Sequence, residues 1–197
     1  MSRPRRPLPK WLERARRLLL QPSAEWAVIA PEFTTPGPIY GRYLIPMAAI
    51  GPVAATLGTI ISGGERSSLA GTYTISVADA VTAGVLEYGL NLIAVYLLAW
   101  LVELLAGSLG GQPNRVQGLK IVAYGATPYW LGGVLALLPK LAPVGVLLGL
   151  YSVRLFWTGL PLVMKTPRDK TAAFTLLVST AGLLTVLLIA AVTRIII

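Results

Sequence analysis

The chain contains no cysteine and no histidine among its 197 residues. Disulfides, thiolate or imidazole metal sites and acid–base catalysis by histidine are therefore excluded. Charged residues are scarce as well, at 13% of the chain, about half the share of a typical soluble domain. Together with 55% hydrophobic residues, this composition indicates that lipid rather than water surrounds most of the chain.

Motifs of known catalytic sites are also missing from the sequence. There is no GxSxG elbow, no Walker loop and no GxGxxG stretch. Asp79 and Asp169 flank different apolar segments, so no pair of aspartates lies inside the membrane. Without histidine, a serine hydrolase would need a lysine partner in the core, and none is placed there. We therefore expect a non-enzymatic protein without a cofactor.

Long apolar segments dominate the rest of the chain. About 20 helical residues cross the hydrocarbon core of a bilayer, which is about 30 Å thick. The pattern predicts an all-α, polytopic membrane bundle of five transmembrane helices, at residues 42–62, 79–106, 119–138, 141–164 and 172–192. We expect these helices to form one domain over residues 39–197, preceded by a basic cytoplasmic segment over residues 1–38.

The basic segment contains a predicted amphipathic helix over residues 10–20. Its apolar residues share one side of the helix, and most of its basic residues lie opposite. This pattern is typical of a short helix that lies on an anionic membrane surface. The alternative is a solvated arm that only sets the orientation of the protein.

The basic residues are distributed unevenly along the chain. The net charge is +9, and seven of the 17 lysines and arginines fall in the first 17 positions. Most others lie in short loops, which indicates membrane orientation and contact with lipid headgroups rather than with nucleic acid. With the N-terminus inside, thirteen lie on the cytoplasmic side, three lie outside, and Arg154 remains in the membrane. The bias predicts a cytoplasmic N-terminus and a C-terminus on the far side.

Arg154 lies near the middle of the fourth apolar segment, where a charge costs about 3 kcal/mol. We therefore expect either that neighbouring helices cover it or that the membrane deforms to reach it. One hypothesis is a polar intramembrane site that takes a small anion, an ion or a lipid headgroup. The alternative is a structural ion pair or polar network that holds the helices together. The candidate residues are Arg154, Glu87, Asn91, Tyr124, Tyr151 and Thr158.

Two long runs of sequence resemble a known family. They are AYGATPYWLGGVLALLPKL and GLYSVRLFWTGLPLVMKTPRDKTAAFT, and with QPSAEWAVIAPE near the start they are similar to the bacterial branch of the Yip1 family. The resemblance implies five transmembrane helices and a cytoplasmic N-terminus, in a bacterial inner membrane with the C-terminus in the periplasm. For eukaryotic relatives it implies trafficking roles and contacts with Rab-type GTPases, and for bacterial members no settled activity. Arg154 departs from the family pattern, which has an aromatic or apolar residue there.

These observations leave two hypotheses for the function. The first is an integral inner-membrane protein that organises the membrane or partner proteins through a basic cytoplasmic face, which contacts anionic headgroups or a protein partner. The second is a channel or transporter for a small solute or ion around Arg154. Gly145 and Gly149 fit either a homo-oligomer contact or packing within one chain. The predicted basic face consists of Arg14, Arg16, Arg17, Lys165, Arg168 and Lys170.

Overall fold

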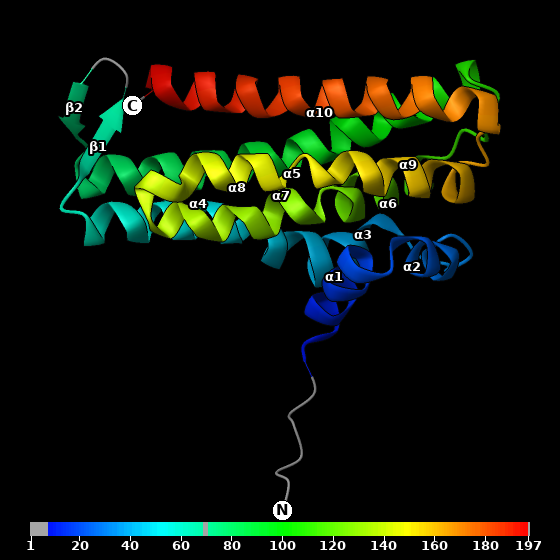
Figure 1. Ribbon diagram of the computed structural model, residues 1–197, viewed down its shortest axis with the longest axis horizontal. Helices are drawn as coiled ribbons and strands as arrows, with labels where there is room; N and C mark the ends of the chain where they lie inside the picture. Colours follow the sequence, from blue (N-terminus) through cyan, green and yellow to red (C-terminus); the bar gives the residue numbers. More distant parts are fainter. Residues whose placement is uncertain (1–7, 69–70, 197) are drawn as a thin grey trace, which may run out of the picture.

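Four helical stretches are long and apolar enough to cross a membrane within residues 8–68 and 71–196, the part of the chain that the computed structural model describes. They lie side by side along the long axis of the molecule (Figure 1). The stretches agree with the first, second, fourth and fifth predicted segments. They are Pro36–Ile61, Val77–Ser108, Ala142–Val163 and Arg168–Ile196. Arg3, Arg5 and Arg6, which enter the predicted charge bias, lie outside the described residues.

The third predicted segment, residues 119–138, is not one long helix. It is divided into α6 (Arg115–Gly125), α7 (Thr127–Gly132) and the 3-10 helix η2 (Gly133–Leu137). Pro128 lies in the first turn of α7, where its missing N–H group is tolerated. Because this segment is broken, the five-span topology stays a prediction.

Several of the other helices have a proline in their first turn, among them α3 (Pro36–Ile39), α4 (Ile45–Ile61) and α8 (Ala142–Leu148). A π-helical turn, η1 (Tyr40–Leu44), joins α3 to α4, directly before Pro46. After these come α5 (Val77–Ser108), η3 (Pro139–Leu141), α8, α9 (Tyr151–Val163) and α10 (Arg168–Ile196).

One element departs from the all-α prediction. The strands β1 (Glu65–Ser68) and β2 (Gly71–Thr74) pair antiparallel at one end of the bundle (Figure 1), between the first and second predicted segments. Gly63 and Gly64 adopt positive φ angles of 65° and 85°, a conformation that costs glycine little. These two residues let the chain turn out of α4 into the hairpin.

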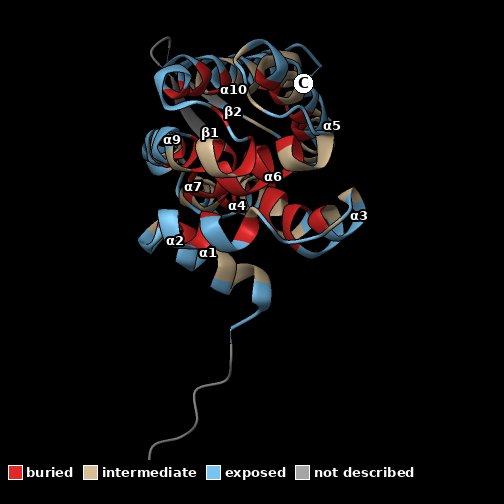
Figure 2. Cartoon of the chain, turned by 90° about the vertical axis from the view of Figure 1, so that its right-hand side faces the viewer, coloured by how far each residue is buried: buried red, intermediate tan, exposed pale blue. Residues whose placement is uncertain are grey.

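The N-terminal helices α1 (Lys10–Leu20) and α2 (Pro22–Ile29) pack against one side of the bundle (Figure 1). Ala15, Leu18, Trp26 and Ile29 are fully buried in the same core as residues of α5, α6, α9 and α10. Figure 2 shows buried residues of these helices facing the bundle. A helix therefore occupies the predicted residues 10–20, and its placement on a membrane surface stays a prediction, as does the division of the chain at residue 38.

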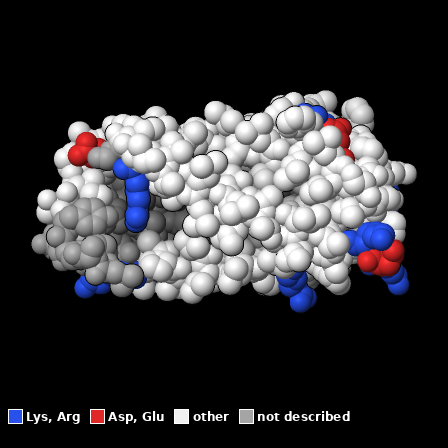
Figure 3. Space-filling view, turned by 90° about the horizontal axis from the view of Figure 1, so that it is seen from above, with Lys and Arg blue, Asp and Glu red and all other residues white. Residues whose placement is uncertain are grey.

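The outer face of α10 is apolar over most of its length. Figure 3 shows a mostly uncharged surface between charged ends. Such a belt is expected where lipid tails surround a helix. Its exposed leucines include Leu176, Leu177, Leu183, Leu184, Leu187 and Leu188.

Candidate functional site

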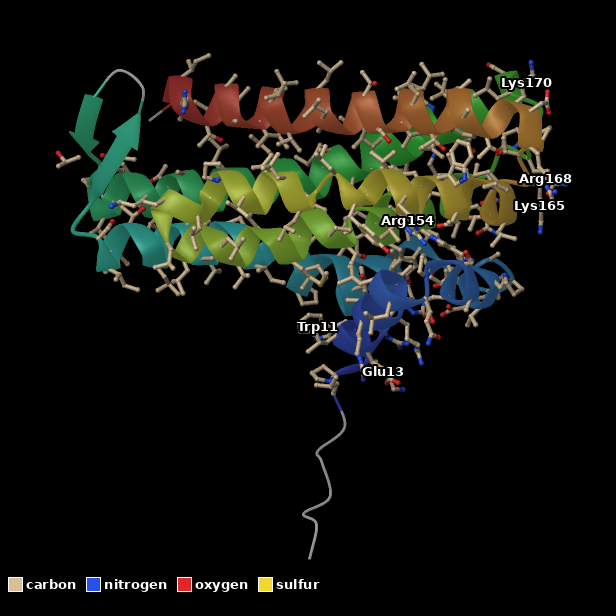
Figure 4. The ribbon with its side chains drawn as sticks, viewed as in Figure 1. Trp11, Glu13, Arg154, Lys165, Arg168 and Lys170 are labelled. Carbon is tan, nitrogen blue, oxygen red and sulfur yellow. The ribbon has the colours of Figure 1, made fainter. Side chains whose placement is uncertain are left out.

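Arg154 lies on the outside of the bundle, in the first turn of α9. Its side chain is exposed, and among the described residues no ion pair includes it. Figure 4 shows it on the side where the N-terminal helices pack. The prediction that neighbouring spans cover Arg154 is therefore wrong, because α9 turns this side chain outward. Thr158, one turn further on, donates to the Arg154 carbonyl oxygen at 3.0 Å.

We expect Arg154→Leu not to lower the free energy of unfolding by more than about 0.5 kcal/mol, because the exposed guanidinium has no ion-pair partner to lose among the described residues. Glu87→Gln combined with it is expected to be additive, since the two side chains do not pair. Unfolding titrations of both single variants and the double variant in detergent would measure this. A coupling above about 1 kcal/mol would show that the two charges interact.

Glu87 and Asn91 lie elsewhere, on the wall of a cavity of about 220 Å³ between α4, α5, α7 and α8. Asn91 is buried and donates through Nδ2 to the Glu87 carbonyl oxygen at 2.9 Å. The predicted polar site is thus divided, since the remaining predicted members do not line this cavity: Arg154, Tyr124, Tyr151 and Thr158.

Tyr151 and Tyr124 instead contact the N-terminal helices. The Tyr151 hydroxyl donates to the carbonyl oxygen of Leu19 at 3.0 Å, which satisfies one of the last carbonyl groups of α1. The Tyr124 hydroxyl accepts from Arg14 Nη1 at 3.3 Å, and the guanidinium lies 5.3 Å from the centre of the tyrosine ring. Both tyrosines therefore help to hold α1 against the bundle.

Charged side chains of α1, α2 and α6, together with Glu32, form what we call the N-terminal ion network: Arg14, Arg17, Glu25, Glu32 and Lys120. Glu25 is only 4% exposed and forms ion pairs with two arginines. Arg17 Nε lies 2.9 Å from Glu25 Oε2, and Arg14 Nε lies 3.4 Å from Oε1, an ion-pair distance without a hydrogen bond. Arg14 Nη1 lies 2.8 Å from Glu32 Oε2. These contacts connect α1 to α2 and to the residues after it.

Arg14 keeps its charge in this partly buried position. Burial by itself would lower the pKa of Arg14, but the nearby Tyr124 hydroxyl and the Glu32 carboxylate outweigh it and raise the pKa. The positive charge of Arg14 is thus stabilised by its partners.

Lys120 of α6 is almost completely buried, at 2% exposed. Its Nζ donates to the carbonyl oxygens of Ile29 at 2.9 Å and Glu32 at 2.6 Å. Gln117, one turn earlier, donates through Nε2 to the Ala30 carbonyl at 3.1 Å. The last carbonyl groups of a helix have no partner inside it and carry partial negative charge. The side chains of Lys120 and Gln117 therefore donate hydrogen bonds to carbonyl groups at the end of α2.

Shape complementarity adds to these polar contacts. A Cβ atom built on Gly159 of α9 would lie 2.7 Å from the ring of Trp26. The indole therefore occupies the space that a side chain at this position would fill. Gly159 permits α2 to approach α9 closely.

The basic residues predicted as a membrane or partner surface fall into two groups. Arg14 and Arg17 belong to the N-terminal ion network. The others are exposed and have no ion pair among the described residues: Arg16, Lys165, Arg168 and Lys170. The last three lie together at one end of the bundle (Figure 4).

Residues 164–170, which we call the basic turn, comprise the connection after α9 and the first turn of α10. Lys165 has a positive φ of 55°, unusual for a residue other than glycine. The Gln112 backbone N–H donates to the Met164 carbonyl at 2.7 Å, and Thr166 Oγ1 donates to the Leu160 carbonyl at 3.4 Å. The turn is therefore fixed by contacts with the loop after α5 and with α9.

Glu25, Glu32 and Lys120 were missed by sequence reasoning. The two glutamates lie in a stretch that reads as polar linker, and Lys120 reads as an orienting charge at a helix end. A signal was present, since both carboxylates follow closely after Arg14 and Arg17. Their pairing depends on how α2 folds back on α1, which spacing alone does not give.

Comparison with known proteins agrees with the resemblance found in the sequence. The model of the Yip1 domain matches residues 16–190. "Inner membrane protein YohC" of Escherichia coli strain K12 is 28% identical over 163 residues, which cover 80% of this chain and 82% of that protein. The protein of the same name from Escherichia coli O6:H1 matches to the same extent. No solved structure matches the chain.

The matched span begins inside α1 and ends inside α10. It includes most of the N-terminal ion network and the whole of the basic turn. It also covers the four candidate membrane spans almost completely. This chain therefore belongs to the Yip1 domain family of integral membrane proteins.

Proposed function

We propose that this protein is a non-enzymatic organiser of the inner membrane or of partner proteins, acting through a basic face on the cytoplasmic side. The observation that carries the proposal is the division of the basic side chains into paired and unpaired ones. Arg14, Arg17 and Lys120 hold the N-terminal helices, whereas another set is exposed and has no ion pair among the described residues. That set is Arg16, Lys165, Arg168 and Lys170.

The chemistry of this face suits an anionic surface. Lysine and arginine side chains near the membrane attract acidic headgroups of the cytoplasmic leaflet. The fixed backbone of the basic turn presents its three cations without a large loss of conformational freedom on binding. The excess of lysine and arginine on this side supports a cytoplasmic N-terminus. With the five predicted segments, the C-terminus then lies in the periplasm.

The experiment neutralises the basic turn with Lys165→Gln, Arg168→Gln and Lys170→Gln together. The protein is placed in nanodiscs that contain equal amounts of anionic and zwitterionic lipid. Native mass spectrometry after release then counts the lipids that stay bound. We expect the ratio of anionic to zwitterionic bound lipid to fall about tenfold in the triple variant, because three exposed cations are removed.

The matched control is Lys140→Gln with Arg194→Gln, which removes cations from other parts of the chain. We expect this double variant to retain the wild-type lipid ratio. An unchanged ratio in the triple variant, with normal folding, would contradict the role of the basic turn.

The second hypothesis, a pathway for a small solute or ion around Arg154, has no specific observation in its favour. Arg154 is exposed and lies away from the cavity lined by Glu87. We therefore do not propose it.

A further inference from the structure

The cavity between α4, α5, α7 and α8 has walls of a particular composition. Most of its lining consists of small or apolar residues, mainly alanine and glycine, with Pro52 and Val146. Val146 is 52% exposed, so the cavity lies close to the outer surface of the bundle. A volume of about 220 Å³ holds several water molecules or one small organic molecule. The walls therefore suit a ligand with a small apolar body.

Glu87 is the acidic residue of this cavity. Among the described residues, no ion pair and no hydrogen bond reaches its carboxylate, and no lysine or arginine lines the cavity. An ionisable side chain inside a membrane is costly unless a partner of opposite charge is present. The lining supplies no such partner, so the carboxyl group either stays neutral or pairs with a cation from outside the chain.

Aromatic side chains also line the cavity. Tyr129 and Trp130 both line the cavity, and their ring centres are 5.0 Å apart. Trp130 is only 5% exposed, and its indole N–H has no hydrogen-bond partner among the described residues. Aromatic faces attract cations, particularly organic ones that carry few water molecules.

The lining also argues against other ligand classes. A small inorganic cation such as Mg²⁺ or Ca²⁺ needs six or more oxygen ligands, or water molecules in their place. The side chains of this cavity offer little beyond the Glu87 carboxylate, the Asn91 amide and the Tyr129 hydroxyl. An anion would meet a carboxylate and no cation.

We infer that this cavity is a binding site for a small organic cation, such as a protonated amine with an apolar body. Glu87 pairs with the charged group, Asn91 contributes its amide, and Tyr129 and Trp130 lie beside the cation. The small residues of α4, α7 and α8 surround the apolar part. This site is independent of the basic turn and of the proposed organising role.

The test uses benzylammonium as the probe and benzyl alcohol as its uncharged analogue of similar shape. Binding to the full chain in nanodiscs of zwitterionic lipid is measured by calorimetry. We expect saturable binding of benzylammonium, with benzyl alcohol at least about tenfold weaker. Glu87→Gln is expected to lower the affinity for benzylammonium about tenfold or more and to leave the affinity for benzyl alcohol unchanged.

Two further variants separate the site from general effects. Asp79→Asn removes an exposed carboxylate from the same helix and should leave both affinities unchanged. Ala142→Leu fills part of the cavity and retains Glu87. It should lower the affinity for both probes. The inference is overturned by absence of saturable benzylammonium binding to the wild type, or by equal affinity for the two probes. It is also overturned if Glu87→Gln folds and binds benzylammonium as the wild type does.

Discussion

Glu25→Ala is expected to lower the free energy of unfolding by about 3 kcal/mol. The Glu25 carboxylate is almost completely buried, and both Arg14 and Arg17 are paired with it. Removal of one member of a buried ion pair costs about 3–5 kcal/mol. Arg14 retains Glu32 and Arg17 retains Glu13 as partners. We expect the lower end, because Arg14 and Arg17 are 19% and 48% exposed and water screens them in part. Unfolding titrations in detergent, followed by circular dichroism, would measure the change.

The matched control is Glu13→Ala. Glu13 pairs with Arg17 one turn away on α1, but both side chains are about half exposed. Exposed pairs of this kind contribute about 0.3–0.5 kcal/mol. If Glu25→Ala cost no more than Glu13→Ala, the N-terminal ion network would contribute little to stability.

Lys120→Met is expected to have an effect of similar size, a loss of about 3 kcal/mol. Methionine retains much of the volume and length of the lysine, so packing changes little. The Ile29 and Glu32 carbonyl groups, however, lose their charged donor. A hydrogen bond to a charged group contributes about 1.5–3 kcal/mol, and a buried carbonyl left without a partner is costly. The same unfolding titration applies.

Lys140→Met provides the control for removing a lysine charge, because Lys140 is exposed. We expect it to change the free energy of unfolding by less than about 0.5 kcal/mol. A stable Lys120→Met variant would mean that these carbonyl groups find other partners.

Helix positions could be predicted from the sequence where one pattern runs without interruption. The predicted helix at residues 10–20 has the bounds of α1, and the fifth predicted segment lies inside α10. The third segment could not be predicted as well. Its hydropathy is continuous, but the backbone breaks at Ala126 before Pro128 and tightens into a 3-10 helix at Gly133.

The arrangement of the polar residues was harder to predict. Hydropathy places Arg154 at a depth along its segment but does not say which way the side chain points. That direction depends on how α8 and α9 rotate against their neighbours. Glu25 meets Arg14 and Arg17 only after α2 folds back on α1. Lys120 meets the carbonyl groups of Ile29 and Glu32 only after α6 packs beside the end of α2. Tertiary packing therefore decided which charges became buried.

The buried charges also bear on the proposed basic face. Arg14 and Arg17 are paired with carboxylates, although Arg17 remains 48% exposed. Arg16, between them in sequence, is exposed. The proposed face is therefore smaller than the total of basic residues suggests, and its main part is the basic turn.

The central claim is that α1 and α2 are fixed to the bundle by the N-terminal ion network. Because the chain has no cysteine, spin labels can be attached through Arg16→Cys on α1 and Val153→Cys on α9, both exposed positions. Double electron–electron resonance in nanodiscs should give one narrow distance distribution, which broadens when Glu25→Ala is added. A broad distribution in the chain that retains Glu25 would contradict the claim.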